Sequence, residues 1–374
     1  MLVIMIGIGP KCNVTFFLVF LSSAVYSQHH KHINERQSVK NDIPNEFVYK
    51  GIALEVEGMH IWGASPILDT NGRTHLYVSQ WPISKENPQD FSGWYKESQI
   101  AHYVSDSPEG PFELVGIAVP DMNGVFNSPH NPTVKYYDGK YVLCFIVNEF
   151  NNPQKQRIVM YVSNDLSDNW EPASRADPDG TILRQSNNNS IWSSKSFRGV
   201  TNPTLLKFKD TYLLYYKGVL CDENKRTDFS KWFFGYGVAY SKKLEGPYIF
   251  HDKMVTPNTI QIEDAYAYQF QDKIILIGRD IRGHYGSSGG GLTMSSTDGF
   301  TFYKSDSYHS YNNLSSYIGF NKMKEYVLYR GDSKGNLERP QFLFKNNTPI
   351  YLYMATGLGK STKFGSTSHV FRLN

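Results

Sequence analysis

One short phrase occurs five times along this chain, and it constrains the fold more than any other feature of the sequence. In each copy a polar residue followed by Pro, or by Ala in one copy, opens a β run that passes a turn and enters a second, Tyr-rich β run. Recurrence of such a hairpin unit every 60 to 75 residues or so is typical of a radial array of β-sheets. The copies occupy residues 65–79, 131–145, 202–216, 264–278 and 339–353.

A second phrase follows each of the first four copies and completes the repeating unit. It is a further β run that ends at a Ser and a turn, at residues 101–112, 159–170, 237–248 and 292–302. Two phrases in constant order make a unit of about four strands, which is the size of a propeller blade. The sequence therefore predicts an all-β fold, a five-bladed β-propeller with an axial active-site funnel. Residues 47–56 are expected to pair with the last blade and close the ring.

The first 27 residues are typical of a secretory signal peptide. Lys11 precedes the apolar run Val14–Leu21, and small residues follow at a suitable cleavage point before Gln28. A membrane anchor is the rival interpretation, but the run is short for a bilayer span. We expect a secreted or periplasmic protein that leaves the membrane after cleavage. The expected parts are a signal peptide, a polar N-terminal segment and a propeller catalytic domain, at residues 1–27, 28–46 and 47–374.

Charge and cysteine content narrow the classes of partner. The sequence has 38 Lys and Arg against 35 Asp and Glu, and this near balance gives no reason to propose a nucleic-acid partner. Cys144 and Cys221 fall in or beside strands of different blades, so we expect free thiols rather than a bridge. No spacing of ligand residues demands a metal, and no cofactor is predicted.

The natural place for chemistry in such a ring is its axis, where the innermost strands of all blades converge and like-placed residues meet. The polar residue that opens each copy stands at the mouth of such a strand. The sequence thus predicts an axial ring of Ser65, Asn131, Asn202, Asp264 and Arg339. The neighbours expected to join this ring are His60, Trp62, His130, Glu263 and Glu338. The plainer alternative, that an X-Pro pair merely starts a strand, explains the Pro but not the polar residues before it.

The five-copy layout resembles the five-bladed glycoside hydrolases of families 43 and 117. The resemblance is carried by the hairpins at residues 138–143 and 210–216, the turns at 107–112 and 244–248, and the acidic segment at 262–268. It implies a sugar substrate and hydrolysis by an acid and a base that face each other across the sugar. Family 43 enzymes typically place an Asp base before the first-blade Pro. This sequence has Ser65 there, and it keeps acidic groups only in the fourth blade, at Glu263 and Asp264.

The groups left near the axis favour a substrate that carries a carboxylate. Elimination from a uronic acid needs a cation or amide to neutralise the carboxylate, a base for the C5 proton, and an acid for the departing C4 oxygen. We therefore favour a lyase or dehydratase that acts on the ends of acidic oligosaccharides and leaves an unsaturated uronate. Candidates for catalysis are His130, His284, Tyr285, Glu263 and Asp264. Candidates for substrate binding are His60, Trp62, Ser65, Asn131, Asn202, Arg279, Arg282, Glu338 and Arg339.

Two other interpretations stay open. A hydrolase could use Glu263 or Asp264 opposite Glu338, and a non-catalytic sugar-binding propeller would explain the missing Asp residues. Arg279 and Arg282 could equally pair with nearby acids in a structural network. The family resemblance also leaves room for a structural cation at the centre of the ring. A closed axial pocket favours exo-action, unless the long loops at residues 84–93 and 186–199 open a groove.

Overall fold

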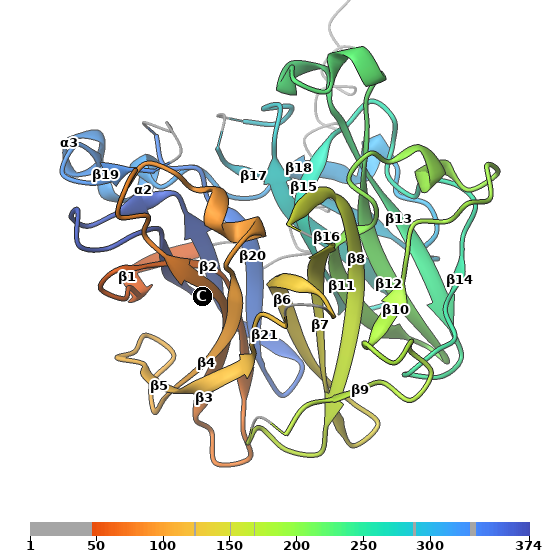
Figure 1. Ribbon diagram of the computed structural model, residues 1–374, viewed down its shortest axis with the longest axis horizontal. Coiled ribbons are helices and arrows are strands. Elements are labelled where there is room, and N and C mark those ends of the chain that lie inside the picture. Colours follow the sequence, from red (N-terminus) through yellow and green to blue (C-terminus); the bar gives the residue numbers. More distant parts are fainter. Residues whose placement is uncertain (1–46, 123–124, 150, 168, 287–288, 330–333) are drawn as a thin grey trace, which may run out of the picture. The chain divides into compact units, whose positions relative to one another are not determined.

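The computed structural model describes residues 47–122, 125–149, 151–167, 169–286, 289–329 and 334–374. The expected signal peptide and polar segment lie outside these residues. Within them, five antiparallel sheets follow one another around a common axis (Figure 1). The predicted all-β, five-bladed propeller is confirmed. None of the helices in the described residues has the length and apolar character needed to cross a membrane.

The blades are consecutive in sequence, and in each of the first four the innermost strand comes first. The first blade contains β2 (Met59–Leu68), β3 (Thr74–Pro82), β4 (Gln99–Ser105) and β5 (Glu113–Val119). The second contains β6 (Asn127–Tyr137), β7 (Lys140–Glu149), β8 (Asn152–Ser163), β9 (Glu171–Pro172) and β10 (Thr181–Leu183). The third contains β11 (Thr201–Phe208), β12 (Thr211–Leu220), β13 (Phe233–Ser241) and β14 (Ile249–Phe250). The fourth contains β15 (Ile262–Phe270), β16 (Lys273–Asp280), β17 (Gly291–Ser296) and β18 (Ser307–His309).

The fifth blade joins the two ends of the described residues. It contains β20 (Glu338–Lys345), β21 (Thr348–Thr356), β23 (Thr367–Leu373) and, as its outer strand, β1 (Phe47–Leu54). Phe47 pairs with Leu373 and Leu54 with Ser368, so the prediction that the N-terminal strand closes the ring is confirmed. This pairing covers an edge of β23 that an open array would expose.

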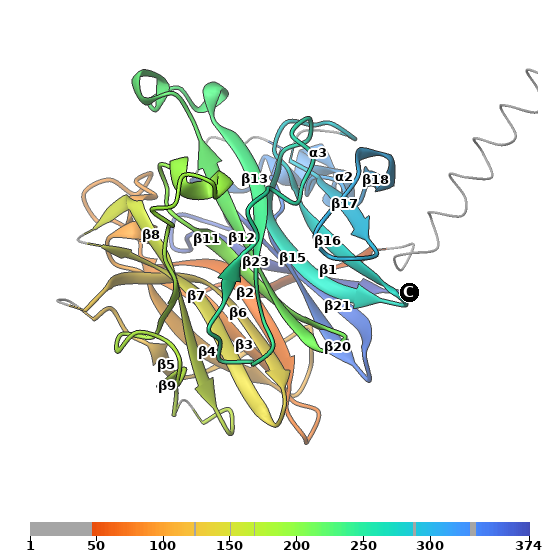
Figure 2. The ribbon, with the colours of Figure 1, turned by 90° about the vertical axis from the view of Figure 1, so that its right-hand side faces the viewer.

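Short elements fill the connections between the strands. The single-turn helices are η2 (Ser92–Tyr95), η3 (Trp192–Lys195), η4 (Glu223–Lys225), η5 (Phe229–Lys231), η6 (Lys304–Asp306), α2 (Ser315–Ile318) and α3 (Phe320–Met323). A small two-stranded sheet pairs β19 (Val327–Leu328) with β22 (Leu358–Gly359). The loop that carries η4 and η5 projects beyond the strands of its blade (Figure 2).

The core lies between the blades rather than inside any one of them. One cluster of buried side chains joins the third blade to the fourth, with Tyr215 and Val238 against Ala267 and Leu276. Another joins the fifth blade to the first, where Tyr353 packs in the same cluster as Ala101. Alternating aromatic and aliphatic residues on each strand supply these facing layers. Because every blade is buried on both faces, the innermost strands are held firmly in place around the axis.

Candidate active site

The five innermost strands bend at the same place, and this bend aims side chains at the axis. Each contains a β-bulge whose central residue has left-handed backbone, with φ between 49° and 63°. These residues are Gly63, Asn131, Asn202, Asp264 and Arg339. A bulge turns its strand locally and redirects a side chain, which suits a site built at a strand mouth.

Four of these five are residues of the predicted ring, and the structure brings them together. Asn131 Nδ2 donates to Asn202 Oδ1 at 2.9 Å, and Asn202 Nδ2 in turn donates to Asp264 Oδ1. Arg339 Nη2 donates to the backbone carbonyl oxygen of Asn131 at 3.1 Å. The amides and the guanidinium are therefore occupied in holding the ring together.

The placement of Ser65 in the ring needs correction. The first-blade member is Gly63, and Ser65 lies two residues further along β2, where its hydroxyl donates to Gln341 Oε1 at 3.2 Å. The prediction took the residue before Pro in each copy of the repeat. In the first blade Ala64 stands where most blades have that Pro, and Pro66 lies two residues further along the strand. A Cβ atom on Gly63 would lie 3.3 Å from Arg339 Nε. The position that resembles the base of family 43 thus has no side chain, and Arg339 fills the space beside it.

Three carboxylates gather at the axis, and two cations hold them. Oxygens of Glu263, Asp264 and Glu338 lie within 4.8 Å of one another. Arg279 Nη1 lies 3.3 Å from Glu263 Oε2 and 3.0 Å from Glu338 Oε1, and Lys217 Nζ lies 2.8 Å from Glu263 Oε1. In the described residues, this is the one group with the spacing of metal ligands. Lys217 and Arg279 already supply its positive charge, so the geometry does not call for a metal ion.

Asp264 is a member of this group whose pKa is raised. Burial raises its pKa to about 6, the negative charge of Glu263 adds to the shift, and Lys217 and Arg339 oppose it. A carboxyl group taken out of water next to another carboxylate keeps its proton to higher pH. Asp264 can therefore act as a proton donor near neutral pH.

The two predicted histidines at the axis are neutral and already bonded. His130 Nδ1 donates to the carbonyl oxygen of Ser128 at 2.6 Å, and Gln156 Nε2 donates to His130 Nε2 at 3.2 Å. Burial lowers the pKa of His130 to about 3. His60 accepts from the backbone N–H of Ser366 at 3.0 Å, and burial lowers its pKa to about 4. Both ring nitrogens of His130 are thus engaged, whereas the buried Nε2 of His60 has no hydrogen-bond partner among the described residues.

The charged run after β16 does not contribute its expected groups to the axis. Arg282 Nη2 donates to the carbonyl oxygen of Trp232 at 2.6 Å and so ties down the loop after β12. His284 Nε2 accepts from the backbone N–H of Gln261 at 3.2 Å, and Tyr285 packs against the core between the third and fourth blades. None of these three residues lines the axial cavity. Elimination by His284 or Tyr285 thus loses its structural support.

A cavity of about 480 Å³ opens above the carboxylates, and we call it the axial cavity. Its wall is largely aromatic. The aromatic lining residues are Trp62, Trp81, Phe91, Trp94, Tyr95, Phe229, Trp232 and Phe234. Rings with one apolar face and a polar edge are suited to stacking on sugars. Much of this wall comes from the loop that carries η2, between β3 and β4, and from the loop between β12 and β13.

Several lining residues were not found from the sequence. Lys217 lies on β12, the second strand of its blade, and Asp90 and Arg198 lie in loops. Arg198 lies 4.9 Å from the ring centroid of Trp232 and 6.0 Å from that of Trp94. Among the described residues, no carboxylate forms an ion pair with Arg198. The repeat pattern gives no signal for loop residues, whereas a Lys in an otherwise apolar strand is a signal that could have been used.

Solved structures with the same architecture include several carbohydrate hydrolases. Zg3597, a family 117 glycoside hydrolase of the marine bacterium Zobellia galactanivorans, matches at 12% identity with a TM-score of 0.60, over 87% of this sequence and 90% of that one. CoXyl43, a family 43 β-xylosidase and α-arabinofuranosidase from a compost metagenome, matches at 16% identity with a TM-score of 0.56, over 87% and 96%. BT0996 in its RGII complex matches at 12% identity with a TM-score of 0.61, over 90% and 94%.

These similarities concern the fold. No family model matches the sequence, and neither does any curated protein. At such identities the shared feature is the five-bladed propeller, whose loops and axial residues vary between activities. The chemistry must therefore be argued from the axial cavity.

Proposed function

We propose that this protein is a carbohydrate-active enzyme that hydrolyses the terminal glycosidic bond of acidic oligosaccharides. The observation that carries the proposal is Asp264, whose pKa is raised to about 6, beside two further carboxylates on the floor of an aromatic cavity. A general acid beside ionised carboxylates is what an oxocarbenium-like transition state requires. The family 43 and 117 enzymes of the same fold support a sugar substrate.

The residues of the cavity divide the work of hydrolysis as follows. Asp264 gives its proton to the departing glycosidic oxygen. The carboxylate of Glu263, which pairs with Lys217 and Arg279, stabilises the positive charge that develops on the sugar. A water molecule attacks the anomeric carbon as the glycosidic bond breaks, and its proton passes to a base.

Asp90 is our candidate for that base. It is the one carboxylate among the described lining residues that lies outside the axial group. Two hydrogen bonds from Ser92 lower the pKa of Asp90 and keep it ionised. Gly63 has no side chain that could accept the proton of the attacking water. In this proposal Asp90, from the loop between β3 and β4, takes that role.

Arg198 is our reason for proposing an acidic substrate. Its guanidinium lines the cavity among aromatic rings, and no carboxylate within the described residues forms a direct ion pair with it. A carboxylate or sulfate on the sugar would form a charge-assisted hydrogen bond with it. Action at the ends of oligosaccharides follows from a pocket walled by two loops. We also propose that residues 1–27 export the protein and are then removed. N-terminal sequencing of the secreted protein tests this, with Gln28 expected as the first residue.

The test is to incubate the protein with uronate-bearing oligosaccharides and with their neutral counterparts. We expect new reducing ends without the ultraviolet absorbance of an unsaturated uronate, and a loss of at least about 100-fold in kcat for Asp264→Asn. Glu113→Gln, which changes an exposed carboxylate on the outer strand of the first blade, outside the cavity lining, should keep full activity. A rise in that absorbance would instead establish elimination, and binding without any product would establish a sugar-binding module.

Arg198→Gln tests the substrate class separately. The variant is expected to raise KM about tenfold for charged oligosaccharides, because one charge-assisted hydrogen bond is lost, and to leave KM for neutral ones unchanged. Equal effects on both kinds of substrate would show that Arg198 supports the wall of the cavity rather than the recognition of an anion.

A further inference from the structure

A second cavity lies at the other end of the same strands. It has a volume of about 710 Å³, and we call it the opposite cavity. The innermost strand of every blade lines it: β15, for example, contributes Glu263 to the axial cavity and Tyr266 to the opposite cavity. The turn between β20 and β21, at the lower end of Figure 1, contributes Asn346 and Asn347 to its rim.

A lysine crosses the axis inside this cavity. Lys135 comes from the second blade, yet its Nζ donates to the hydroxyl of Tyr266 on the fourth blade and lies 3.8 Å from the centroid of that ring. The same Nζ lies 5.7 Å from the ring of Phe344 on the fifth blade. Within the described residues, no carboxylate pairs with Lys135. Burial lowers the pKa of Lys135 to about 7, as expected for an ammonium group without an anion.

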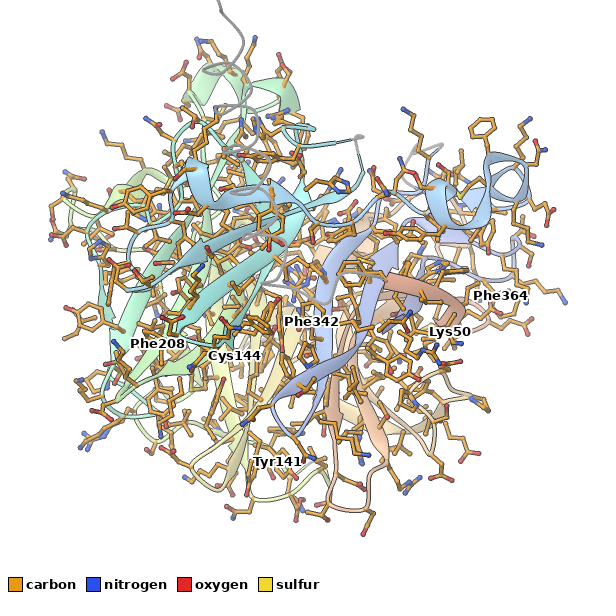
Figure 3. All side chains as sticks on the ribbon, turned by 180° about the vertical axis from the view of Figure 1, so that it is seen from behind. Lys50, Tyr141, Cys144, Phe208, Phe342 and Phe364 are labelled. Carbon is orange, nitrogen blue, oxygen red and sulfur yellow. The ribbon has the colours of Figure 1, made fainter. Side chains whose placement is uncertain are left out.

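Aromatic rings continue from this lysine along the wall of the cavity. The centroid of Phe342, labelled in Figure 3, lies 6.0 Å from that of Tyr266 and 5.1 Å from that of Tyr268. Phe344 lies 5.9 Å from Tyr268. Tyr266, Tyr268 and Phe342 are buried and form the foundation of this wall. The lining rings that remain open are the half-buried Phe344 and the exposed Tyr136, and such rings can accept the apolar side of a pyranose.

We propose that the opposite cavity is a second, non-catalytic binding site for an acidic sugar, whose carboxylate is bound by Lys135 and whose ring packs on the accessible rings of Phe344 and Tyr136. The site shares with the proposed function only the class of sugar, and it does not depend on catalysis. A polymer bound there would be kept near the enzyme while its end is processed in the axial cavity. Avidity of this kind strengthens binding without any new contact in the active site.

The other cation of this cavity provides a comparison. Lys207 Nζ lies 2.5 Å from Asp138 Oδ1, so its charge is already neutralised at the rim. Lys135 has only a phenol oxygen as its partner among the described residues. An incoming carboxylate therefore gains more from Lys135 than from Lys207.

Calorimetric titration tests the proposal. Oligogalacturonate and oligoglucuronate of three units are the probes, and maltotriose is the neutral control. The Arg198→Gln variant, in which binding to the axial cavity is weakened, is expected still to bind the acidic probes. Adding Lys135→Met should lower this remaining affinity at least about tenfold. At pH 8 this binding should take up protons, seen as a dependence of the measured heat on the buffer, because the bound anion raises the pKa of Lys135. Lys242→Met, on the outer part of the third blade, should change neither result.

The outcomes separate this proposal from the previous one. Hydrolysis without Lys135-dependent binding would overturn the second site and leave the proposed function intact. Lys135-dependent binding without hydrolysis would establish the second site alone. Equal binding of maltotriose would also overturn the proposed second site, because the site would then not distinguish acidic from neutral sugars. Met fills much of the volume of the Lys stem, and an unchanged unfolding midpoint of Lys135→Met would show that a lost affinity is not a loss of fold.

Discussion

At the scale of single residues, the axis is built from backbone that most side chains avoid. Asn131, Asn202 and Asp264 adopt left-handed conformations that Asn and Asp tolerate better than other residues do, and Arg339 adopts the same conformation at a higher cost. Strain of this kind persists where the surrounding structure demands it. The polar residue before Pro, or before Ala in the fourth blade, predicted these four positions, because the same pattern recurs. Gly63 offered no polar side chain and was missed.

Asp264→Asn should stabilise the protein while it removes activity. The pKa of Asp264 is about 6 in the folded protein and 3.8 for an ordinary Asp, so the favourable effect of its proton on folding is complete below pH 3.8 and is lost as the pH rises through 6. At pH 8 the buried charge opposes folding, and Asn carries none. We expect a gain of about 3 kcal/mol in the free energy of unfolding at pH 8 and little change at pH 3. Urea unfolding at both values measures it, and equal changes at both would contradict the assignment.

At the scale of elements, strands and loops differ in how far the sequence reveals them. The strands repeat, because each blade must present the same alternating faces to its neighbours, so the hairpins and the closing strand could be predicted. The loops carry no such constraint. Trp94 and Arg198 reach the axial cavity through loops with no period, and only the assembled ring shows that they meet there.

Trp232→Ala should show what the loop after β12 contributes. The indole Nε1 donates to the carbonyl oxygen of Arg226 at 2.9 Å, which anchors the ring beside Arg198. Loss of the ring is expected to raise KM for the charged substrate about tenfold with little change in kcat, since a stacking contact and a cation–π contact are both removed. Tyr303→Ala, at an exposed ring outside the cavity lining, is the matched control. A drop in kcat alone would place Trp232 in the chemistry instead.

At the scale of the whole molecule, the ring is closed by β1, which is the first strand in the sequence and the outer strand of the fifth blade. Strand β1 pairs with β23, and its Ala53 and Leu54 join the core between the first and fifth blades. Contacts between residues more than 300 positions apart therefore complete the fold. Such closure removes sheet edges, and it makes the stability of the last blade depend on the start of the domain.

Removal of β1 should open the ring. We compare a protein that starts at Phe47 with one that starts at Glu55. The shorter protein is expected to unfold at a lower urea concentration and to associate, because β23 would then offer unpaired backbone groups. Urea denaturation and light scattering measure the two effects. An unchanged midpoint with a monomeric shorter protein would show that the outer strand is dispensable.

The row formed by Lys217, Glu263, Arg279 and Glu338 alternates in sign and sums to zero. A neutral row projects little field into the solvent, so the lining charges outside it, the cationic Arg198 and the ionised Asp90, have more weight in the attraction or repulsion of a charged sugar. The charges of this row also affect the pKa of Asp264. Loss of the Lys217 charge would leave the acidic residues less compensated, and the pH at which Asp264 gives up its proton would shift upward. One change on a neighbouring strand could thus adapt the enzyme to a more alkaline habitat while the proton donor itself stays the same.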